Sequence, residues 1–240
     1  SEWTYGDSKS TEVKVTDKVT LTGEIDDIAF YNSVSNGTVT IVAVPKTKDI
    51  FEEVEPVTFT GVATLSQVSD IETGVRTITI TDIESDVTVT FAGTYTYDLV
   101  TEWEVTAGEA TQMIYNYYYQ SNFSKILRIR EGDKDIPVAF TNTFSTSGTK
   151  TLKYSFTDKT VPGSIFEKCP ALCGVRVSNT VTGIGGYAFS KTSIRHFELP
   201  ATVTSYGSGV LYDCLELESV ILPDNLTEIY DSMFRGCESL

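Results

Sequence analysis

Hydrophobic and polar residues alternate along the first hundred residues, in short runs that end at turn-forming residues. Because successive side chains of a strand point to opposite faces, each run predicts a strand with one buried face and one mostly threonine face. Asn36-Gly37 and Glu72-Thr73-Gly74 are turn signals between such runs. Six or seven strands at this spacing predict an immunoglobulin-like β-sandwich over residues 1–100. The runs are residues 11–15, 19–22, 38–44, 57–60, 76–80 and 87–91.

Residues 101–157 have a different texture, with an aromatic run followed by short apolar segments separated by turns. We expect two or three β-hairpins that form a linker and cap for the region that follows. Tyr115, Tyr117 and Tyr119 are candidates for a glycan platform, because an aromatic ring suits the apolar face of a sugar. The alternative interpretation is that these rings pack a seam between domains.

Apolar residues recur with a period of 22–23 residues in the last third of the chain. Phe166, Phe189, Leu211 and Phe234 occupy one position of this period, which we call the Phe slot. Each period contains one short strand and is too small to bury its own apolar residues, so neighbouring units must stack. The pattern predicts a short solenoid of three and a half units over residues 158–240. The chain is therefore expected to be mainly β throughout.

Three of the four cysteines follow the same period. Cys169, Cys214 and Cys237 each lie three residues after the Phe slot, and Cys173 is additional. A buried thiol behaves as a small apolar group, and this spacing reflects stacking rather than metal ligation. We expect reduced interior thiols and no metal site among them. Disulfides between Cys169 and Cys173, or between Cys214 and Cys237, are the alternative.

Two segments of the repeat region resemble a known family: VTGIGGYAF at residues 181–189 and LESVILPDNLTEI at residues 217–229. They resemble the BspA-like leucine-rich repeats of bacterial surface proteins, whose pattern runs L-x-x-I-x-I-P-x-x-V-x-x-I-G-x-x-A-F-x-x-C and which are common in Bacteroidetes. The resemblance covers about residues 158–240. Tyr206, the Gly209-Val210-Leu211 segment and a second unit without its cysteine depart from the pattern. Residues 1–100 resemble no family that we can name.

The resemblance implies export to the cell surface or beyond, often as an outer-membrane lipoprotein, and adhesion to host or neighbouring-cell proteins. We expect the contact surface on the strand face that is not committed to the core, with a plain solvated face as the alternative. A glycan-binding accessory protein of a polysaccharide-utilisation system is the second functional hypothesis. The expected surface contains Gly174, Arg176, His196, Glu198, Ser219 and Ile221.

An enzyme is not expected. A hydrolase built on a histidine would have to use His196, the single histidine of the chain. Ser193 and Cys173 lie near it in the sequence, but the repeat assigns both to structural positions. No cofactor is expected either.

The net charge of −15 argues against nucleic acid as a partner, because an acidic chain repels phosphates. No apolar run approaches the roughly 18 residues of a membrane span.

Loop carboxylates suggest either calcium ligands or solvated charges. Because Leu240 interrupts a unit, we expect either a longer parent chain or self-association through the open repeat. The loop carboxylates are Glu24, Asp26, Asp27, Asp82, Glu84 and Asp86.

Overall fold

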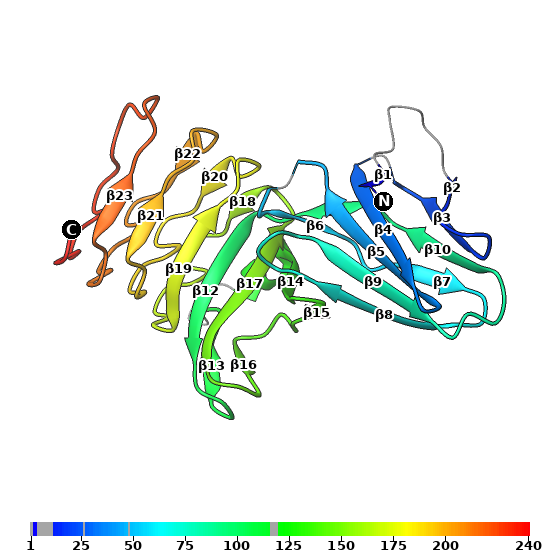
Figure 1. Cartoon of the computed structure of the whole chain (residues 1–240). Coiled ribbons are helices and arrows are strands. Elements are labelled where there is room, and N and C mark those ends of the chain that lie inside the picture. The colour runs from blue at the N-terminus through cyan, green and yellow to red at the C-terminus, as the bar shows by residue number, and fades with distance from the viewer. Residues whose placement is uncertain (1, 4–11, 26, 48, 116–119) are drawn as a thin grey trace. The chain divides into compact units, whose positions relative to one another are not determined.

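The computed structural model describes residues 2–3, 12–25, 27–47, 49–115 and 120–240. The chain divides into two compact units, residues 1–96 and residues 97–240, which are described separately. Nearly all regular structure consists of strands (Figure 1), and among the described residues the one helical element is the 3₁₀ helix η1 (Gln120–Lys125). The expectation of a mainly β protein is confirmed.

The first unit contains two larger sheets. One has the antiparallel order β1-β4-β5-β9-β8, and the other has the order β2-β3-β10-β7 with β3 and β10 parallel. A short third sheet pairs β11 with β6. The strands are β1 (Glu2–Trp3), β2 (Glu12–Lys14), β3 (Val19–Gly23), β4 (Ile28–Ser35), β5 (Thr38–Pro45), β6 (Glu52–Val54), β7 (Thr58–Thr60), β8 (Thr64–Ser69), β9 (Arg76–Thr81), β10 (Val87–Phe91) and β11 (Thr94–Thr96).

The two larger sheets share one hydrophobic cluster. Leu21 of β3 and Ile41 of β5 are buried in it, and the rings of Phe30 and Phe91 meet edge to face at 4.9 Å between centroids. The alternation read from the sequence is present in β5, where every second residue from Val39 is buried. The immunoglobulin-like outline of this unit stays a prediction.

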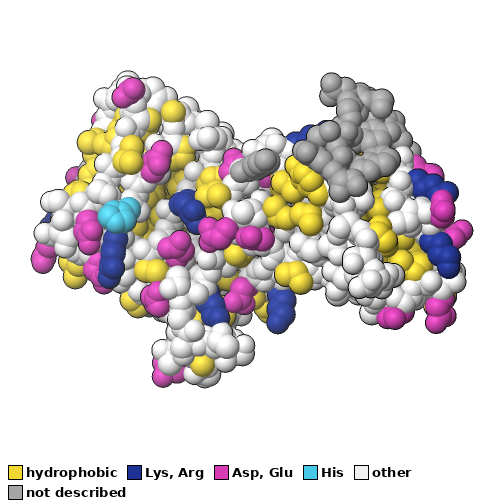
Figure 2. Space-filling view, in the orientation of Figure 1, with side chains coloured by type: hydrophobic (Ala, Val, Ile, Leu, Met, Phe, Trp, Pro, Cys, Tyr) yellow, Lys and Arg dark blue, Asp and Glu magenta, His cyan; other side chains and the backbone are white. Residues whose placement is uncertain are grey.

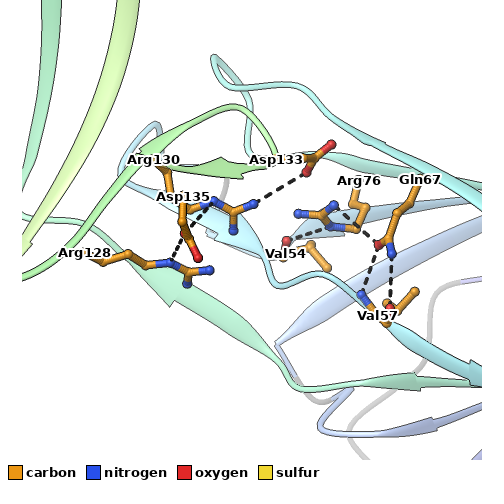
Figure 3. Close-up of polar contacts among 8 residues, drawn as sticks. All are labelled: Val54, Val57, Gln67, Arg76, Arg128, Arg130, Asp133 and Asp135. Atoms are coloured by element: carbon orange, nitrogen blue, oxygen red, sulfur yellow. Dashed lines mark hydrogen bonds and ion pairs between the residues drawn. The ribbon is translucent and has the colours of Figure 1, made fainter. Parts of the chain in front are cut away.

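Local turn chemistry and one buried cation shape the first unit. Asn36 and Gly37 both have positive φ, 49° and 78°, so they form the tight turn between β4 and β5 that the Asn-Gly pair predicts. The buried Arg76 donates from Nε to the Val54 carbonyl at 3.0 Å, which ties β9 to β6 (Figure 3). Gln67 of β8 exchanges hydrogen bonds with the Val57 backbone beside it.

The second unit begins with a five-stranded antiparallel sheet of order β15-β14-β17-β12-β19. β12 lies between β17 and β19, so a strand of the expected cap pairs directly with the strand of the first repeat (Figure 1). The strands up to the first repeat are β12 (Leu99–Val105), β13 (Ala110–Gln112), β14 (Ile126–Glu131), β15 (Lys134–Asp135), β16 (Thr141–Thr143), β17 (Gly148–Phe156), β18 (Thr160–Val161) and β19 (Leu172–Val177).

The remaining strands form two short parallel ladders, β18-β20-β22 and β21-β23. Val161 pairs with Ile184 and Ile184 with Tyr206, so the position five residues before the Phe slot stays in register from one repeat to the next. These strands are β20 (Gly183–Ile184), β21 (His196–Glu198), β22 (Ser205–Tyr206) and β23 (Ser219–Ile221).

The residues of the Phe slot form one column. The Phe166 and Phe189 rings stack with centroids 5.7 Å apart and an interplanar angle of 12°. Backbone N–H groups continue the column, since Phe166 donates to the Ala188 carbonyl at 3.0 Å and Leu211 to the Met233 carbonyl at 3.1 Å. These contacts agree with the predicted spacing at Phe166, Phe189 and Leu211, and the finer outline of the solenoid stays a prediction.

Each repeat also contains two residues in the left-handed backbone region, two positions before and two after the Phe slot. In the first three repeats, the N–H groups of both residues donate to the following repeat. Six of these eight residues are not glycine, so the sequence carries no obvious signal for them. The pairs are Ser164 and Lys168, Tyr187 and Lys191, Gly209 and Asp213, and Ser232 and Gly236.

The core of the second unit runs from the cap into the repeats without a break. The Trp103 ring of β12 meets the Phe166 ring edge to face at 5.8 Å, and Tyr154 of β17 meets it at 5.3 Å. Both strands therefore cover the apolar end of the first repeat.

A buried carboxylate lies at the same junction. Asp98 is fully buried and accepts hydrogen bonds from the Phe156 N–H at 2.8 Å, from Lys159 Nζ at 3.0 Å and from Thr180 Oγ1 at 2.8 Å. Its own backbone carbonyl accepts the Ser178 N–H at 2.9 Å. One side chain thus joins segments that are up to 82 residues apart in the sequence.

Candidate binding face

Strands β12, β19, β21 and β23 lie side by side in the second unit and present one exposed face (Figure 1). We call this the strand face. Alternation places Val175, Val177 and Phe197 in the core. The residues proposed from the sequence are all on the other side: Arg176 on β19, His196 and Glu198 on β21, and Ser219 and Ile221 on β23.

The register between β21 and β23 decides which of these side chains meet. His196 pairs with Ser219 across the ladder, and Glu198 pairs with Ile221. His196 Nδ1 lies 2.8 Å from Ser219 Oγ, and His196 Nε2 lies 3.9 Å from Glu218 Oε2. Figure 2 shows the histidine on this side of the unit, among acidic and basic side chains. Ile221 is 61% exposed, so the strand face presents an apolar side chain beside Glu198.

This contact bears on the hydrolase hypothesis. The hydroxyl beside His196 belongs to Ser219, whereas the Ser193 N–H donates to the Leu172 carbonyl at 3.0 Å within the repeat backbone. The side chains of His196 and Glu218 are 69% and 58% exposed. A serine-histidine-carboxylate group in bulk water lacks the shielded surroundings and oriented donors on which such catalysis depends.

A hollow of about 640 Å³ lies where β12, β17, β19 and the start of β21 meet. The polar groups around it include Glu102 and Glu104 of β12, Arg176 of β19, and His196. Arg176 and Glu102 form an ion pair at 3.7 Å, and Arg195 beside the hollow pairs with Glu216 at 3.3 Å. The sequence did not single out Glu102 or Glu104, because nothing in their own strand indicates a neighbour 70 residues away.

Cys173 also faces this hollow. Burial raises the pKa of the Cys173 thiol, and the neighbouring Glu104 and Glu102 carboxylates raise it further. The thiol donates to the Glu102 carbonyl at 3.3 Å. It therefore stays protonated at neutral pH, and a protonated thiol is a poor nucleophile.

A second hollow of about 520 Å³ lies at the far ends of β21 and β23. Glu198, Ile221 and Asp224 are among the residues that line it. The strand face is thus indented at both ends, and carboxylates lie at each indentation.

Of the proposed glycan platform, only Tyr115 is among the described residues; Tyr117 and Tyr119 lie outside them. Lys168 of the first repeat donates from Nζ to the Tyr115 hydroxyl at 2.7 Å, and the same nitrogen is 4.7 Å from the ring centroid. The Tyr115 N–H also donates to the Ile165 carbonyl at 2.9 Å. Tyr115 is therefore held against the first repeat.

A second aromatic group was not recognised in the sequence. The rings of Tyr187 and Tyr212 meet at 6.0 Å on the turn side of the repeats. Lys191 Nζ and Arg235 Cζ are 5.7 Å and 5.9 Å from the centroid of the Tyr212 ring. These contacts come from side chains at neighbouring slots of successive repeats, so only the stacking brings them together.

All four cysteines are free thiols; Cys169 and Cys214 are buried, as expected, whereas Cys173 and Cys237 are half-buried. Cys214 donates to the Phe189 carbonyl and Cys237 to the Leu211 carbonyl, both at 3.1 Å. Thr192 occupies the cysteine slot of the second unit and donates to the Phe189 carbonyl at 2.8 Å. Burial raises the pKa of Cys214 and, together with the neighbouring Cys214 sulfur, raises that of Cys237 to about 11.

Within the described residues, no group of three or more histidine, cysteine, aspartate or glutamate side chains is arranged to hold a metal ion. Asp26 of the first acidic loop lies outside those residues. In the same part of the chain, no helix is long and apolar enough to cross a membrane.

A family model described as the BspA type leucine rich repeat region matches residues 139–240 in six copies. The C-terminal part of this chain is a BspA-type leucine-rich repeat region. The match to the BspA-type repeat begins at residue 139, so it includes β17 and residues that the sequence assigned to the cap. No curated protein and no solved structure was found to match the chain. The BspA-type repeat suggests a protein-interaction module of a bacterial surface protein.

Proposed function

We propose that this protein is a non-enzymatic recognition module that binds a host or neighbouring-cell protein through the strand face of its repeats. The observation that carries the proposal is the exposed row of Arg176, His196, Glu198, Ser219 and Ile221 across three neighbouring strands. Repeat proteins use such continuous rows as extended contact surfaces. The exposed Ile221 beside charged side chains is the mixed composition that protein interfaces contain.

The BspA-type repeats support a place outside the bacterial cell for this module. The proposed form is a secreted or surface-anchored protein, in particular an outer-membrane lipoprotein of Bacteroidetes. The division into a sandwich (1–100), a hairpin cap (101–157) and a repeat solenoid (158–240) is part of the proposal. In this arrangement the cap covers one end of the stacked repeats. The contacts of the Trp103 and Tyr154 rings with the Phe166 ring support this part of the proposal.

The glycan-binding alternative rests on Tyr115, Tyr117 and Tyr119. It is supported by the partial exposure of Tyr115, which leaves part of one ring accessible beside a lysine. Binding to a glycan array that is lost on substitution of Tyr117 or Tyr119 would favour this alternative over protein recognition.

Self-association through the last repeat is a further part of the proposal. Ile229 and Leu240 on that repeat are 53% and 55% exposed, and either a second copy or a further repeat of a longer parent chain would cover them. Sedimentation of the chain across a hundredfold concentration range tests this. A replacement of Ile229 by serine is expected to weaken any association.

The test of recognition is a binding panel of purified host matrix proteins and bacterial surface proteins against the immobilised chain. The face variant combines Glu198→Ala with Ile221→Ser, and the control variant combines Tyr187→Ser with Lys191→Ala on the turn side. For a protein that binds, we expect the face variant to weaken affinity at least tenfold and the control to leave it unchanged. A panel protein that loses affinity with the control variant rather than with the face variant would count against the proposal. A panel in which no protein binds would also count against it.

A further inference from the structure

We infer that the hollow beside Gly174 accepts a lysine or arginine side chain of the bound partner. This inference rests on the proposed function and names the chemistry that one part of the strand face recognises. It concerns the hollow of about 640 Å³ between β12, β19 and the start of β21, and it assigns the central role to Glu104.

Gly174 and Glu102 both line the hollow, and the glycine decides where the Glu102 side chain lies. Gly174 pairs with Glu102 across the β12–β19 ladder. A Cβ atom at position 174 would lie 2.6 Å from Glu102 Oε2 and 3.1 Å from Glu102 Cβ. The Glu102 side chain therefore occupies the space that a Cβ atom at position 174 would need, and the glycine lets the Glu102 carboxylate lie at the edge of the hollow. This is a specific use of glycine within a strand, where it otherwise weakens packing.

The charges around the hollow are unequal. Arg176 is paired with Glu102, and Arg195 is paired with Glu216. Within the described part of the chain, the polar contact of the Glu104 carboxylate is with the neutral Thr149 hydroxyl. The cations on the rim are thus neutralised, whereas Glu104 contributes a charge that no cation offsets. A cationic group from the partner complements this arrangement, and an anionic group does not.

The lining also suits the stem of such a side chain. Val100 and Val175 are among the lining residues but are only 2% and 7% exposed, so the apolar part of the lining is narrow and is extended by the half-buried, protonated Cys173 thiol. Lysine and arginine lay their apolar stems along surfaces of this kind while the charged end remains hydrated. The Arg176–Glu102 pair is long at 3.7 Å, and both side chains are more than 40% exposed, so an incoming cation can also reach Glu102. The overall charge of −15 attracts basic partners in general.

His196 makes the inference directly measurable. It lines the hollow and is the single histidine of the chain, so its imidazole resonances are unambiguous in an NMR spectrum. The probe is the capped tripeptide Ala-Lys-Ala, with Ala-Arg-Ala as a second cation. Tripeptides with glutamate or norleucine in the central position serve as charge and shape controls. Because one exposed ion pair is weak, binding in the millimolar range is expected.

We expect a saturable shift of the His196 resonances with both cationic peptides and none with the glutamate or norleucine peptides. Glu104→Gln keeps the size of the side chain and its contact with Thr149, and it is expected to weaken binding about threefold to fivefold. Glu109→Gln removes an exposed charge outside the hollow and should leave binding unchanged. Equal shifts with norleucine, no saturable shift, or equal binding by the Glu104→Gln variant would overturn the inference.

The same variants separate this inference from the proposed function. If a panel protein loses affinity with the face variant but not with Glu104→Gln, recognition by the strand face stands and the cation hollow is wrong. If lysine peptides titrate the hollow while no panel protein binds, the hollow stands and the proposed protein recognition loses its support.

Discussion

The Asp98 carboxylate lies 3.0 Å from the Lys159 ammonium and is fully buried, whereas the lysine side chain is 46% exposed. The same carboxylate also binds the Phe156 N–H and the Thr180 hydroxyl. A single acid therefore connects the sheet of the cap to the loops of the first two repeats. Removal of such a group leaves buried donors without an acceptor, which costs more than the ion pair contributes.

We predict that Asp98→Ala lowers the free energy of unfolding by about 3 kcal/mol, because the Phe156 and Thr180 donors lose their acceptor. Lys159→Gln should cost less, about 0.5 kcal/mol, because the lysine is half exposed and water replaces its partner. Urea unfolding followed by the fluorescence of Trp103, in a background in which Trp3 is replaced by phenylalanine, measures both. Equal losses for the two variants would show that the ion pair, not the buried hydrogen bonds, carries the stability.

The Phe column makes a second prediction. Phe189→Ala removes a fully buried ring that stacks on Phe166, and we expect a loss of about 3–5 kcal/mol in the second unit. Phe189→Leu should cost about 1 kcal/mol, because Leu211 fills the same slot in the next repeat. Thermal unfolding provides the comparison. Phe59→Ala is the control, since that ring is 39% exposed in the first unit and its loss should leave the second unit unaffected.

The cysteine slot predicts a loss of stability at alkaline pH. The folded-state pKa of Cys237 is raised to about 11, above the ordinary thiol value of about 8.5 in an unfolded chain. Between these values the unfolded chain releases a proton that the folded chain retains, so stability is complete below about pH 8.5 and falls as the pH rises toward 11. Urea unfolding at pH 8, 9 and 10 should show this fall.

The matched variant for the alkaline prediction is Cys237→Ser, which keeps a donor for the Leu211 carbonyl but does not titrate in this range. It should have a shallower loss of stability between pH 8.5 and 10 than the wild type. The same slope in both proteins would mean that other groups, such as lysines and tyrosines, cause the alkaline effect.

Gly209 provides a test of the left-handed positions. Its φ is +62°, and a Cβ atom there would lie 2.5 Å from Cε1 of Tyr187. Gly209→Ala is expected to cost about 2 kcal/mol, from the left-handed backbone and from displacement of the ring. Adding Tyr187→Ala should recover the part caused by the ring contact. A double variant no more stable than predicted by adding the two single losses would contradict this account.

Turn chemistry and repeat spacing were readable from the sequence, because both depend on residues close together in the chain. Asn36-Gly37 adopts the expected turn, and the Phe slot forms the expected column. β8 (Thr64–Ser69) was missed, and its burial pattern explains why: its residues are exposed or half-buried, so no apolar face marks it. β4 (Ile28–Ser35) was missed as well, because its buried alternation stops after Phe30 and its last residues are exposed.

The candidate site divides in the same way. The period placed Arg176, His196, Glu198, Ser219 and Ile221 on one strand face, because stacked repeats repeat their exposed positions as regularly as their buried ones. The role of each residue in binding stays a prediction. The hollow was not foreseen, because Glu102 and Glu104 reach it only through the pairing of β12 with β19.

The sequence by itself determined the β composition, the period and the identity of the slots, since these follow from local alternation and from the need of each small repeat to share its core. Tertiary structure alone decided where β12 pairs, which acid lies buried at the junction, and which glycine makes room for the Glu102 side chain beside the hollow. Those features join segments that are tens of residues apart, and their energies depend on burial and on partners that no local pattern of residues specifies.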